Sequence, residues 1–290
     1  MTLGSGVLMQ PQQTPTFDPQ PEIKLIAADM DGTLLDDEHE LHDHFWPLVH
    51  ELHQRGILLC PASGRQYFNL LERFTDIADE LVFIAENGTL VMHQGREISS
   101  DTLTPIDVHR LVTTIRGHIA AGVNAGIVVC GKRSAYVDRR DHPFINEVAR
   151  YYTRLQLVDD LLDITDDEVL KVSVFDFGSA EHSTAPALAD FHVSHQVTVS
   201  GAHWVDITTC TANKGRAIRH LQDTFAITPA QTMVFGDFLN DLEMMDAAEY
   251  SFAMDNAHPE LRQRARYIAP PNRQNGVVRT ISAVLELPWT

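Results

Sequence analysis

Three short apolar runs near the start of the chain, at residues 23–28, 57–60 and 81–85, constrain its fold most strongly. Each run is too short for a helix and shows no alternation of apolar and polar residues, which is typical of a strand buried on both faces. Apolar residues at helical spacing over 45–52 separate the first two runs, with Asp43 placed to cap that helix. Because strands joined through helices pair in parallel with right-handed crossovers, the pattern predicts a parallel α/β sheet.

The same pattern returns near the end of the chain, after a middle segment of a different kind. A helix after Asn213 precedes short strands at 232–235, 250–254 and 267–269, with a helix at 242–248 between the first two. In the middle segment helices alternate with strand pairs, which indicates a small antiparallel sheet faced by helices. Its expected elements are a helix at 105–121, a hairpin at 127–137, a helix at 144–153, a strand at 170–175, a short helix at 185–191 and a strand pair at 197–207.

Together these patterns predict a Rossmann-like parallel-sheet α/β core with an inserted α+β domain. We place the core at residues 21–101 and 209–290, the inserted domain at 102–208, and a flexible tail at 1–20. The tail contains neither the basic start nor the apolar stretch of a signal peptide.

The acidic composition bears on the partners that the chain could bind. The formal net charge is −18, which argues against nucleic acid and membrane as partners because both attract basic surfaces. No apolar run approaches the roughly 20 residues that a membrane helix needs. Cys60, Cys130 and Cys210 lie far apart and form no metal or redox motif, as expected for reduced thiols. We therefore expect a cytoplasmic protein, which could bind a phosphate ester only where its site carries local positive charge.

The first predicted strand ends in two carboxylates, Asp29 and Asp31, followed by Gly32 and Thr33. Ligands of open parallel sheets bind beyond the carboxyl ends of the strands, which is where these residues lie. Neighbouring carboxylates repel each other unless a cation lies between them, and Mg²⁺ prefers such oxygen ligands. The pattern indicates a magnesium site, and an Asp-Gly turn with incidental acids is the alternative.

Two further segments could hold or neutralise a phosphoryl group. Ser63, Gly64 and Arg65 follow the second predicted strand, where a small hydroxyl and an accessible backbone N–H can bind a phosphoryl oxygen. Lys214 opens the helix that follows the inserted domain, and its compact cation can neutralise phosphate charge. Taken singly, these residues could equally be an ordinary loop and a solvated lysine.

Acidic and amide side chains recur where the strand at 232–235 ends. Asp237, Asn240 and Asp241 lie there, at the same edge of the predicted sheet as Asp29. Asn240 and Asp241 could also cap the helix that begins at this point, and capping does not exclude a role in the site.

These segments, in this order, resemble the motif set of the haloacid dehalogenase-like phosphatases. The Asp-x-Asp-Gly-Thr, Ser-Gly-Arg, Lys-Gly and Gly-Asp-x-x-Asn-Asp segments are most similar to the Cof-type sugar-phosphatase branch, and the resemblance covers the chain from Ile23 onward. That branch carries a large α/β cap where the inserted domain lies. Glu86-Asn87-Gly88 resembles its segment at the cap junction.

The resemblance also implies a role for each matching residue. Asp29 attacks phosphorus and binds magnesium, while Asp31 protonates the leaving group, activates the water and binds the metal through its backbone carbonyl. Asp237 is the remaining metal ligand and Asp241 supports the metal site. Lys214 is counted with the catalytic residues and holds phosphoryl oxygens together with Ser63 and Asn240. The residues assigned to the substrate are Gly32, Thr33, Ser63, Gly64, Arg65, Asn87 and Asn240.

Histidines and aromatic residues outside these segments have less specific interpretations. His39, His42 and His44 cluster after the first motif, where a zinc site is the alternative to a solvated helix entrance. His203 and Trp204, in the last predicted strand pair, are candidate contacts of the cap to the substrate.

The predicted function is Mg²⁺-dependent hydrolysis of small phosphorylated metabolites, such as sugar phosphates or phosphorylated cofactors, through an aspartyl-phosphate. The alternatives are a phosphomutase on the same fold and a catalytically silent binding or regulatory protein. The sequence does not indicate an oligomeric state.

Overall fold

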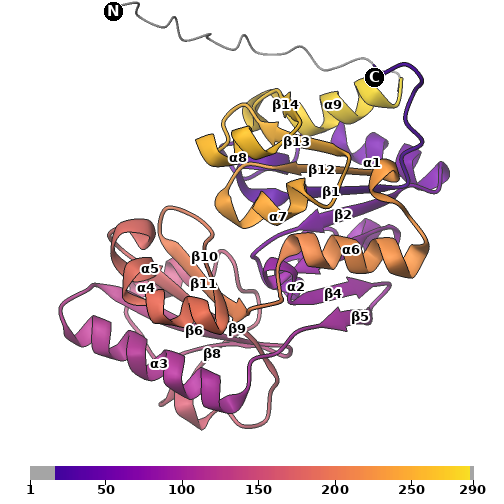
Figure 1. Ribbon diagram of the computed structural model, residues 1–290. Coiled ribbons are helices and arrows are strands. Elements are labelled where there is room, and N and C mark those ends of the chain that lie inside the picture. Colours follow the sequence, from indigo (N-terminus) through magenta and orange to yellow (C-terminus); the bar gives the residue numbers. More distant parts are fainter. Residues whose placement is uncertain (1–16, 288–290) are drawn as a thin grey trace, which may run out of the picture.

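The computed structural model describes residues 17–287 (Figure 1). Most of the predicted tail, residues 1–16, lies outside the described residues. The residues that follow it contact the protein, since the Phe17 ring lies edge-on to Tyr250 and Tyr267 at centroid distances of 5.1 and 5.4 Å. Among the helices of the described range, none combines the length and apolar character that a bilayer span requires.

The larger of two sheets has eight strands in the order β14-β13-β12-β1-β2-β3-β4-β5 (Figure 1). From β14 to β3 neighbouring strands run parallel, while β4 and β5 are antiparallel at one edge. The strands are β1 (Leu25–Asp29), β2 (Leu58–Ala62), β3 (Val82–Ala85), β4 (Leu90–His93), β5 (Arg96–Ser100), β12 (Thr232–Gly236), β13 (Tyr250–Met254) and β14 (Tyr267–Ala269). The predicted parallel α/β core is therefore confirmed.

The registers of the central strands bring the loops after β1, β2 and β12 together. They meet where the carboxyl ends of these strands lie, which we call the functional edge of the larger sheet. Asp29, the last residue of β1, pairs with Ala62 at the end of β2. On the other side of β1, Ala28 pairs with Phe235, so β12 ends beside β1. Because the three strands run in the same direction, the segments that follow them lie next to one another, where parallel sheets place binding sites.

Helices that pack on the larger sheet are α1 (Phe45–Gln54), α2 (Tyr67–Arg73), α6 (Lys214–Phe225), α7 (Leu242–Met245), α8 (Pro259–Arg264) and α9 (Gly276–Val284) (Figure 1). Helix α1 buries the apolar residues whose spacing predicted it. Its cap position is His44 and not Asp43, so the predicted cap is wrong. Asn213 does cap α6, because its side chain accepts a hydrogen bond from the Arg216 backbone N–H.

The smaller sheet has six strands in the order β10-β11-β9-β6-β7-β8. Neighbours are antiparallel except for β7 and β8, a parallel pair that the sequence analysis did not predict. Its strands are β6 (Ala125–Gly131), β7 (Ala135–Val137), β8 (Leu155–Leu157), β9 (Val169–Asp176), β10 (His195–Val199) and β11 (Trp204–Thr209), and its helices are α3 (Pro105–Ala120), α4 (His142–Val148) and α5 (Ala185–Ala187). The predicted α+β class of this part is confirmed.

The two faces of the smaller sheet carry different side chains. One face of β9 and β11 contributes valine and isoleucine to an apolar cluster with α3. Side chains alternate between the faces of a strand, so the residues between them face the other way. Lys171 of β9 lies on that second face, and its Nζ donates a 2.6 Å hydrogen bond to the Gly64 backbone carbonyl after β2. The second face of the smaller sheet therefore adjoins the functional edge of the larger one.

A hairpin at the edge of the larger sheet was missing from the sequence analysis. Its strands, β4 and β5, are joined by Gln94 and Gly95, whose φ angles are 51° and 69°. Left-handed backbone at both positions is the geometry of a two-residue hairpin turn, which favours glycine. The Gln-Gly pair was thus a signal, but the strands beside it are short and only partly buried. Helix α4 also ends at Val148, before the predicted end at 153.

Candidate active site

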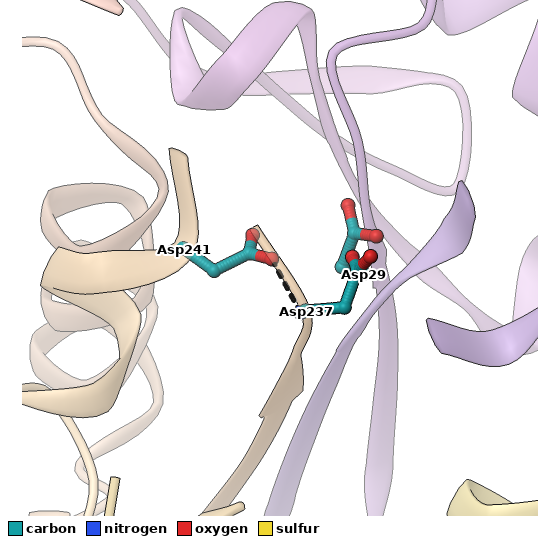
Figure 2. Close-up of side chains that lie close together, drawn as sticks. All are labelled: Asp29, Asp237 and Asp241. Atoms are coloured by element: carbon teal, nitrogen blue, oxygen red, sulfur yellow. Dashed lines mark hydrogen bonds between the residues drawn. The ribbon is translucent and has the colours of Figure 1, made fainter. Parts of the chain in front are cut away.

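Three carboxylates converge at the functional edge of the larger sheet (Figure 2). Asp29 ends β1, Asp237 follows β12, and Asp241 directly precedes α7. One oxygen atom from each of these side chains lies within 4.8 Å of the other two. Asp241 is held in place by the Asp237 backbone N–H, which donates a 3.0 Å hydrogen bond to its Oδ2. The structure thus brings together three of the four residues predicted as metal ligands.

Lys214 supplies positive charge inside this cluster. Its Nζ lies 2.5 Å from Asp29 Oδ1 and 2.7 Å from Asp241 Oδ1, and the side chain is fully buried at the start of α6. Burial alone would lower the pKa of the ammonium, but the charges of the two carboxylates outweigh burial and raise the pKa. The charged form of Lys214 is therefore favoured, as expected of a lysine that neutralises phosphate charge.

Three carboxyl groups lie beside this one ammonium. Burial raises the pKa of Asp29 to about 7, opposed by the Lys214 charge and reinforced by the charge of Asp241. Burial and the charges of Asp29 and Asp241 likewise raise the pKa of Asp237 well above its usual value. Three carboxylates crowded around one ammonium, with only oxygen atoms as donors, fit a divalent cation that prefers oxygen ligands.

Asp31 lies outside this cluster and binds Arg65 instead. The Arg65 guanidinium makes a bidentate contact, with Nη2 at 2.5 Å from Asp31 Oδ1 and Nε at 2.7 Å from Oδ2. Burial would raise the pKa of Asp31, but the hydrogen bonds and charge of Arg65, aided by His39, outweigh burial and lower the pKa. The structure therefore separates the Asp31 carboxylate from the other predicted metal ligands.

His39 is a contact of Asp31 that sequence reasoning missed. Its Nδ1 lies 3.1 Å from Asp31 Oδ1, and its backbone carbonyl accepts a 2.9 Å hydrogen bond from Arg73 Nη1. The zinc alternative for the histidine cluster gains no support, because the metal-competent group found over residues 17–287 contains no histidine. The available signal was a histidine close to the first motif. The direction in which the His39 side chain points depends on the fold of the loop after that motif, which the sequence does not give.

Gly32 and Thr33 pack against Asp237. Gly32 has a φ of +79°, and a Cβ atom there would lie 2.3 Å from Asp237 Oδ2, so the position requires glycine. The Thr33 hydroxyl donates a 3.2 Å hydrogen bond to Asp237 Oδ1. Asn256, which the sequence analysis did not single out, donates a 2.8 Å hydrogen bond from Nδ2 to the Gly32 carbonyl. Thr33 thus positions the carboxylate of Asp237, and Gly32 leaves room for it.

Ser63 and Gly64 form the loop between β2 and Arg65. Ser63 is buried, and its Oγ accepts a 3.1 Å hydrogen bond from the Arg65 backbone N–H. A Cβ atom on Gly64 would lie 3.1 Å from Asn87 Oδ1, so the loop passes close to the segment after β3. This close approach places the loop beside the amide side chain of Asn87.

Two amide side chains link the two sheets. Asn240 Nδ2 donates a 3.0 Å hydrogen bond to Asn87 Oδ1. Asn87, which has a left-handed φ of 59°, in turn donates from Nδ2 to Asp206 of β11. Asp206 also accepts a hydrogen bond from the hydroxyl of Ser173 on β9. The predicted residues Asn87 and Asn240 therefore begin a chain of hydrogen bonds that ends in the smaller sheet.

A buried lysine of the smaller sheet, Lys171, completes this network. Its Nζ lies 3.0 Å from Glu86 Oε2 and 3.4 Å from Asp206 Oδ1, and all three side chains are almost fully buried. Burial would lower the pKa of Lys171, but the charges of Asp206 and Glu86 outweigh burial and raise it. For Glu86, burial is the larger effect and raises the pKa despite the lysine. The signal for Lys171 was a single cation in a predicted strand of alternating apolar side chains.

The site lies in a cavity of about 400 Å³ between the two sheets. Seven predicted residues line it: Asp29, Asp31, Ser63, Gly64, Arg65, Asp237 and Asn240. The other predicted residues, Gly32, Thr33, Asn87, Lys214 and Asp241, contact members of this set as described above. The smaller sheet and its connections supply Glu147, Arg150, Tyr151, Tyr152, Lys171, Phe175, Ser200, Gly201, Ala202, His203, Trp204 and Asp206. The two candidate contacts His203 and Trp204 are therefore part of the cavity wall.

A known hydrolase family matches this chain over most of its length. The pattern of the haloacid dehalogenase-like hydrolases matches residues 26–281, and the chain belongs to this family. The family predicted from the motifs is therefore confirmed.

Individual relatives of this chain have been named as phosphatases. A 5-amino-6-(5-phospho-D-ribitylamino)uracil phosphatase, YbjI from Escherichia coli (strain K12), is 34% identical over 269 residues, which cover 91% of this chain and 97% of the relative. The HMP-PP phosphatase of Cronobacter sakazakii is 30% identical over 247 residues, covering 82% and 86% of the two chains. The predicted enzyme class, a haloacid dehalogenase-like hydrolase with phosphatases among its relatives, is confirmed.

Solved structures share the fold over nearly the whole chain. SMU.1108c from Streptococcus mutans UA159 superposes with a TM-score of 0.84 at 27% identity, covering 91% of this chain and 99% of that one. The sugar phosphatase BT4131, described as subclass IIB of the superfamily, has a TM-score of 0.78 at 19% identity and covers 91% and 100%. The second likeness establishes the common fold alone.

Proposed function

We propose that this chain is a Mg²⁺-dependent phosphatase that hydrolyses small phosphorylated metabolites through a phosphorylated Asp29. The observation that carries the proposal is the position of Asp29. Its buried carboxylate lines the cavity, lies within 4.8 Å of Asp237 and Asp241 in the acidic cluster, and contacts Lys214 at 2.5 Å. A nucleophilic carboxylate beside fixed positive charge is what transfer of a phosphoryl dianion requires.

Asp29, Asp237 and Asp241 would hold the magnesium ion, with the backbone carbonyl of Asp31 as a further ligand. When bound, Mg²⁺ supplies charge that offsets the phosphoryl oxygens during transfer. Lys214 adds a second positive charge, since its Nζ donates a hydrogen bond to Asp29 Oδ1. Thr33 keeps Asp237 oriented through its 3.2 Å hydrogen bond. Ser63 and Asn240, which line the same cavity, are placed to bind phosphoryl oxygens.

The reaction divides into two transfers. In the first, an Asp29 oxygen bonds to phosphorus while the ester bond breaks, and Asp31 gives its proton to the leaving oxygen. In the second, water attacks the phosphorus of the phosphorylated Asp29, Asp31 takes a proton from that water, and Asp29 is released. Pairing with Arg65 favours the carboxylate form of Asp31, which is the form the second step needs. The negative charge of an arriving phosphate favours the protonated form for the first step.

We further propose that residues 102–208 form a cap on a core at 21–101 and 209–290, and that the cap closes the cavity over the substrate. Several contacts favour a closed arrangement. Arg65 Nη1 donates a 2.9 Å hydrogen bond to the Arg150 carbonyl, and the Gln66 side chain makes two hydrogen bonds, of 2.8 and 2.9 Å, with the backbone of Arg154. Closure of this kind excludes water from the reacting phosphate.

The relatives suggest which esters to assay first. The Escherichia coli relative is named for 5-amino-6-(5-phospho-D-ribitylamino)uracil, and similarity to it extends over 91% of this chain. We therefore place this compound at the head of a panel of sugar phosphates and phosphorylated cofactors.

The decisive experiment measures phosphate release from 4-nitrophenyl phosphate and from this panel, with Mg²⁺ or with chelator. Wild type is compared with Asp29→Asn and with Asp43→Asn, an exposed aspartate outside the site. We expect activity that requires Mg²⁺, is unchanged in Asp43→Asn and falls at least about 1000-fold in Asp29→Asn, as for other nucleophile replacements. Full activity of Asp29→Asn would refute the nucleophile. A requirement for a sugar bisphosphate would favour a phosphomutase, and binding without turnover of any ester would favour a silent binding protein.

A further inference from the structure

The smaller sheet forms one wall of the cavity, and the side chains on this wall change from polar to aromatic along β9 and β11. On the antiparallel pair β9 and β11, Ser173 lies opposite Asp206, and Phe175 lies opposite Trp204. The residues between them, such as Val174 and its partner on β11, belong to the apolar cluster on the other face. Alternation along the strands therefore turns both cross-strand pairs to the cavity side.

The polar pair lies at the phosphate end of the cavity. Asp206 accepts a hydrogen bond from Asn87, which is bonded to Asn240 of the proposed phosphate site. Lys171, on the same face of β9, donates to the Gly64 carbonyl in the loop after β2. These bonds tie this end of the wall to the two core segments that flank the acidic cluster.

The aromatic pair lies one step along the same strands from the polar pair, on the same face of the sheet. Trp204 lies two positions before Asp206 along β11, a distance of roughly 7 Å in an extended strand. The rings of Phe175 and Trp204 are 5.1 Å apart between centroids, and Tyr151 meets Trp204 edge-on at 5.4 Å. The neighbouring turn, 200–202, lines the cavity with small residues only.

We propose that Phe175, Trp204 and Tyr151 form a ring-binding subsite for the leaving group of the substrate. Flat rings stack on aromatic side chains, and such a pair contributes beyond the area it buries. The spacing from the polar pair to the aromatic pair calls for an ester in which a short polar chain separates the phosphate from a planar ring. Hydroxyl groups of that chain pass the polar pair, where the Asp206 carboxylate accepts hydrogen bonds.

This inference rests on the proposed function and narrows its substrate class. It distinguishes phosphate esters of a ring carried on a polyol chain from simple sugar phosphates, which carry no planar ring that could stack on Trp204. The compound named for the Escherichia coli relative joins a uracil ring to a phosphate through a ribityl chain, and so belongs to the class that the wall selects.

The test compares an ester that has the ring with one that lacks it. The two substrates are 5-amino-6-(5-phospho-D-ribitylamino)uracil and ribitol 5-phosphate, and 4-nitrophenyl phosphate reports the chemistry itself. The variants are Trp204→Leu, Trp204→Phe, which keeps a ring, and Trp46→Leu. Trp46 is the matched control because it is an exposed tryptophan on α1 that does not line the cavity.

We expect wild type to prefer the ring-bearing ester. Trp204→Leu should lower kcat/KM for that ester about 10-fold, mainly through KM, and change ribitol 5-phosphate less than about 2-fold. Trp204→Phe should retain most of the preference, and Trp46→Leu all of it. Equal losses on both esters, or no loss on either, would overturn the subsite.

Binding separates this inference from the proposed chemistry. Calorimetric titration of Asp29→Asn with both esters should show tighter binding of the ring-bearing one, and this preference should disappear when Trp204→Leu is added. Equal affinities would refute the subsite whether or not wild type releases phosphate. Preferential binding together with no hydrolysis of any ester by wild type would refute the phosphatase proposal and leave the subsite supported.

Discussion

Replacement of Lys171 by methionine tests the buried network between the two sheets. The Nζ atom of Lys171 contacts Glu86 Oε2 at 3.0 Å, Asp206 Oδ1 at 3.4 Å and the Gly64 carbonyl at 2.6 Å. Methionine fills a similar volume without the charge, so the substitution leaves two buried carboxylates unpaired. Removal of one partner from a buried ion pair costs about 3–5 kcal/mol, a large part of the stability of a typical domain.

The assay is equilibrium unfolding in urea, followed by far-ultraviolet circular dichroism and tryptophan fluorescence at pH 8 and pH 5. At pH 8 we expect the free energy of unfolding to fall by about 3–5 kcal/mol. Lys24→Met is the matched control, because Lys24 forms an exposed ion pair with Glu22 at 3.0 Å, and it should lose less than about 1 kcal/mol.

The pH dependence follows from the raised pKa of Glu86. When the pKa of a carboxyl group is higher in the folded state than in the unfolded state, the free energy of unfolding falls as the pH rises through the folded pKa. Without Lys171 the pKa of Glu86 rises further, so protonation at pH 5 relieves part of the penalty. The loss caused by Lys171→Met should therefore be smaller at pH 5 than at pH 8, and Glu86→Gln should restore part of it. A loss below about 1 kcal/mol at both pH values would refute the reasoning.

Two further substitutions test contacts of the site. Gly32→Ala should lower activity at least about 10-fold and raise the Mg²⁺ concentration needed, because its Cβ would lie 2.3 Å from Asp237 Oδ2. Gly56→Ala has a similar φ of +68° with open space around it, so it should lose about 1 kcal/mol of stability and keep its activity. Gln66→Ala removes two hydrogen bonds to the Arg154 backbone and should raise KM several-fold for the preferred ester, whereas the exposed Gln54→Ala should not. Unchanged KM in Gln66→Ala would count against cap closure.

The local sequence determined which segments form strands and where those strands end. Buried runs such as Leu25–Asp29 and Thr232–Gly236 stop at polar residues, and parallel strands align their ends at one edge. For this reason Asp29 and Asp237 could be expected to lie close together, although roughly 200 residues of chain lie between the two strands. Helix α6 could be predicted in the same way, because Asn213 can cap a helix and the apolar residues after it recur at helical spacing.

The tertiary structure alone decided which partner each polar group binds. Asp29 and Asp31 lie two positions apart where one strand ends, but a left-handed turn follows at Gly32 and the Asp31 carboxylate binds Arg65 and His39 instead of joining the Asp29 cluster. The same holds for Lys171, whose partners Glu86 and Asp206 lie on other strands and loops. Periodicity reports which face of a strand is buried, but it does not report what packs against that face. A buried charge is stable only with its partners, and those partners are set by the packing of the two sheets.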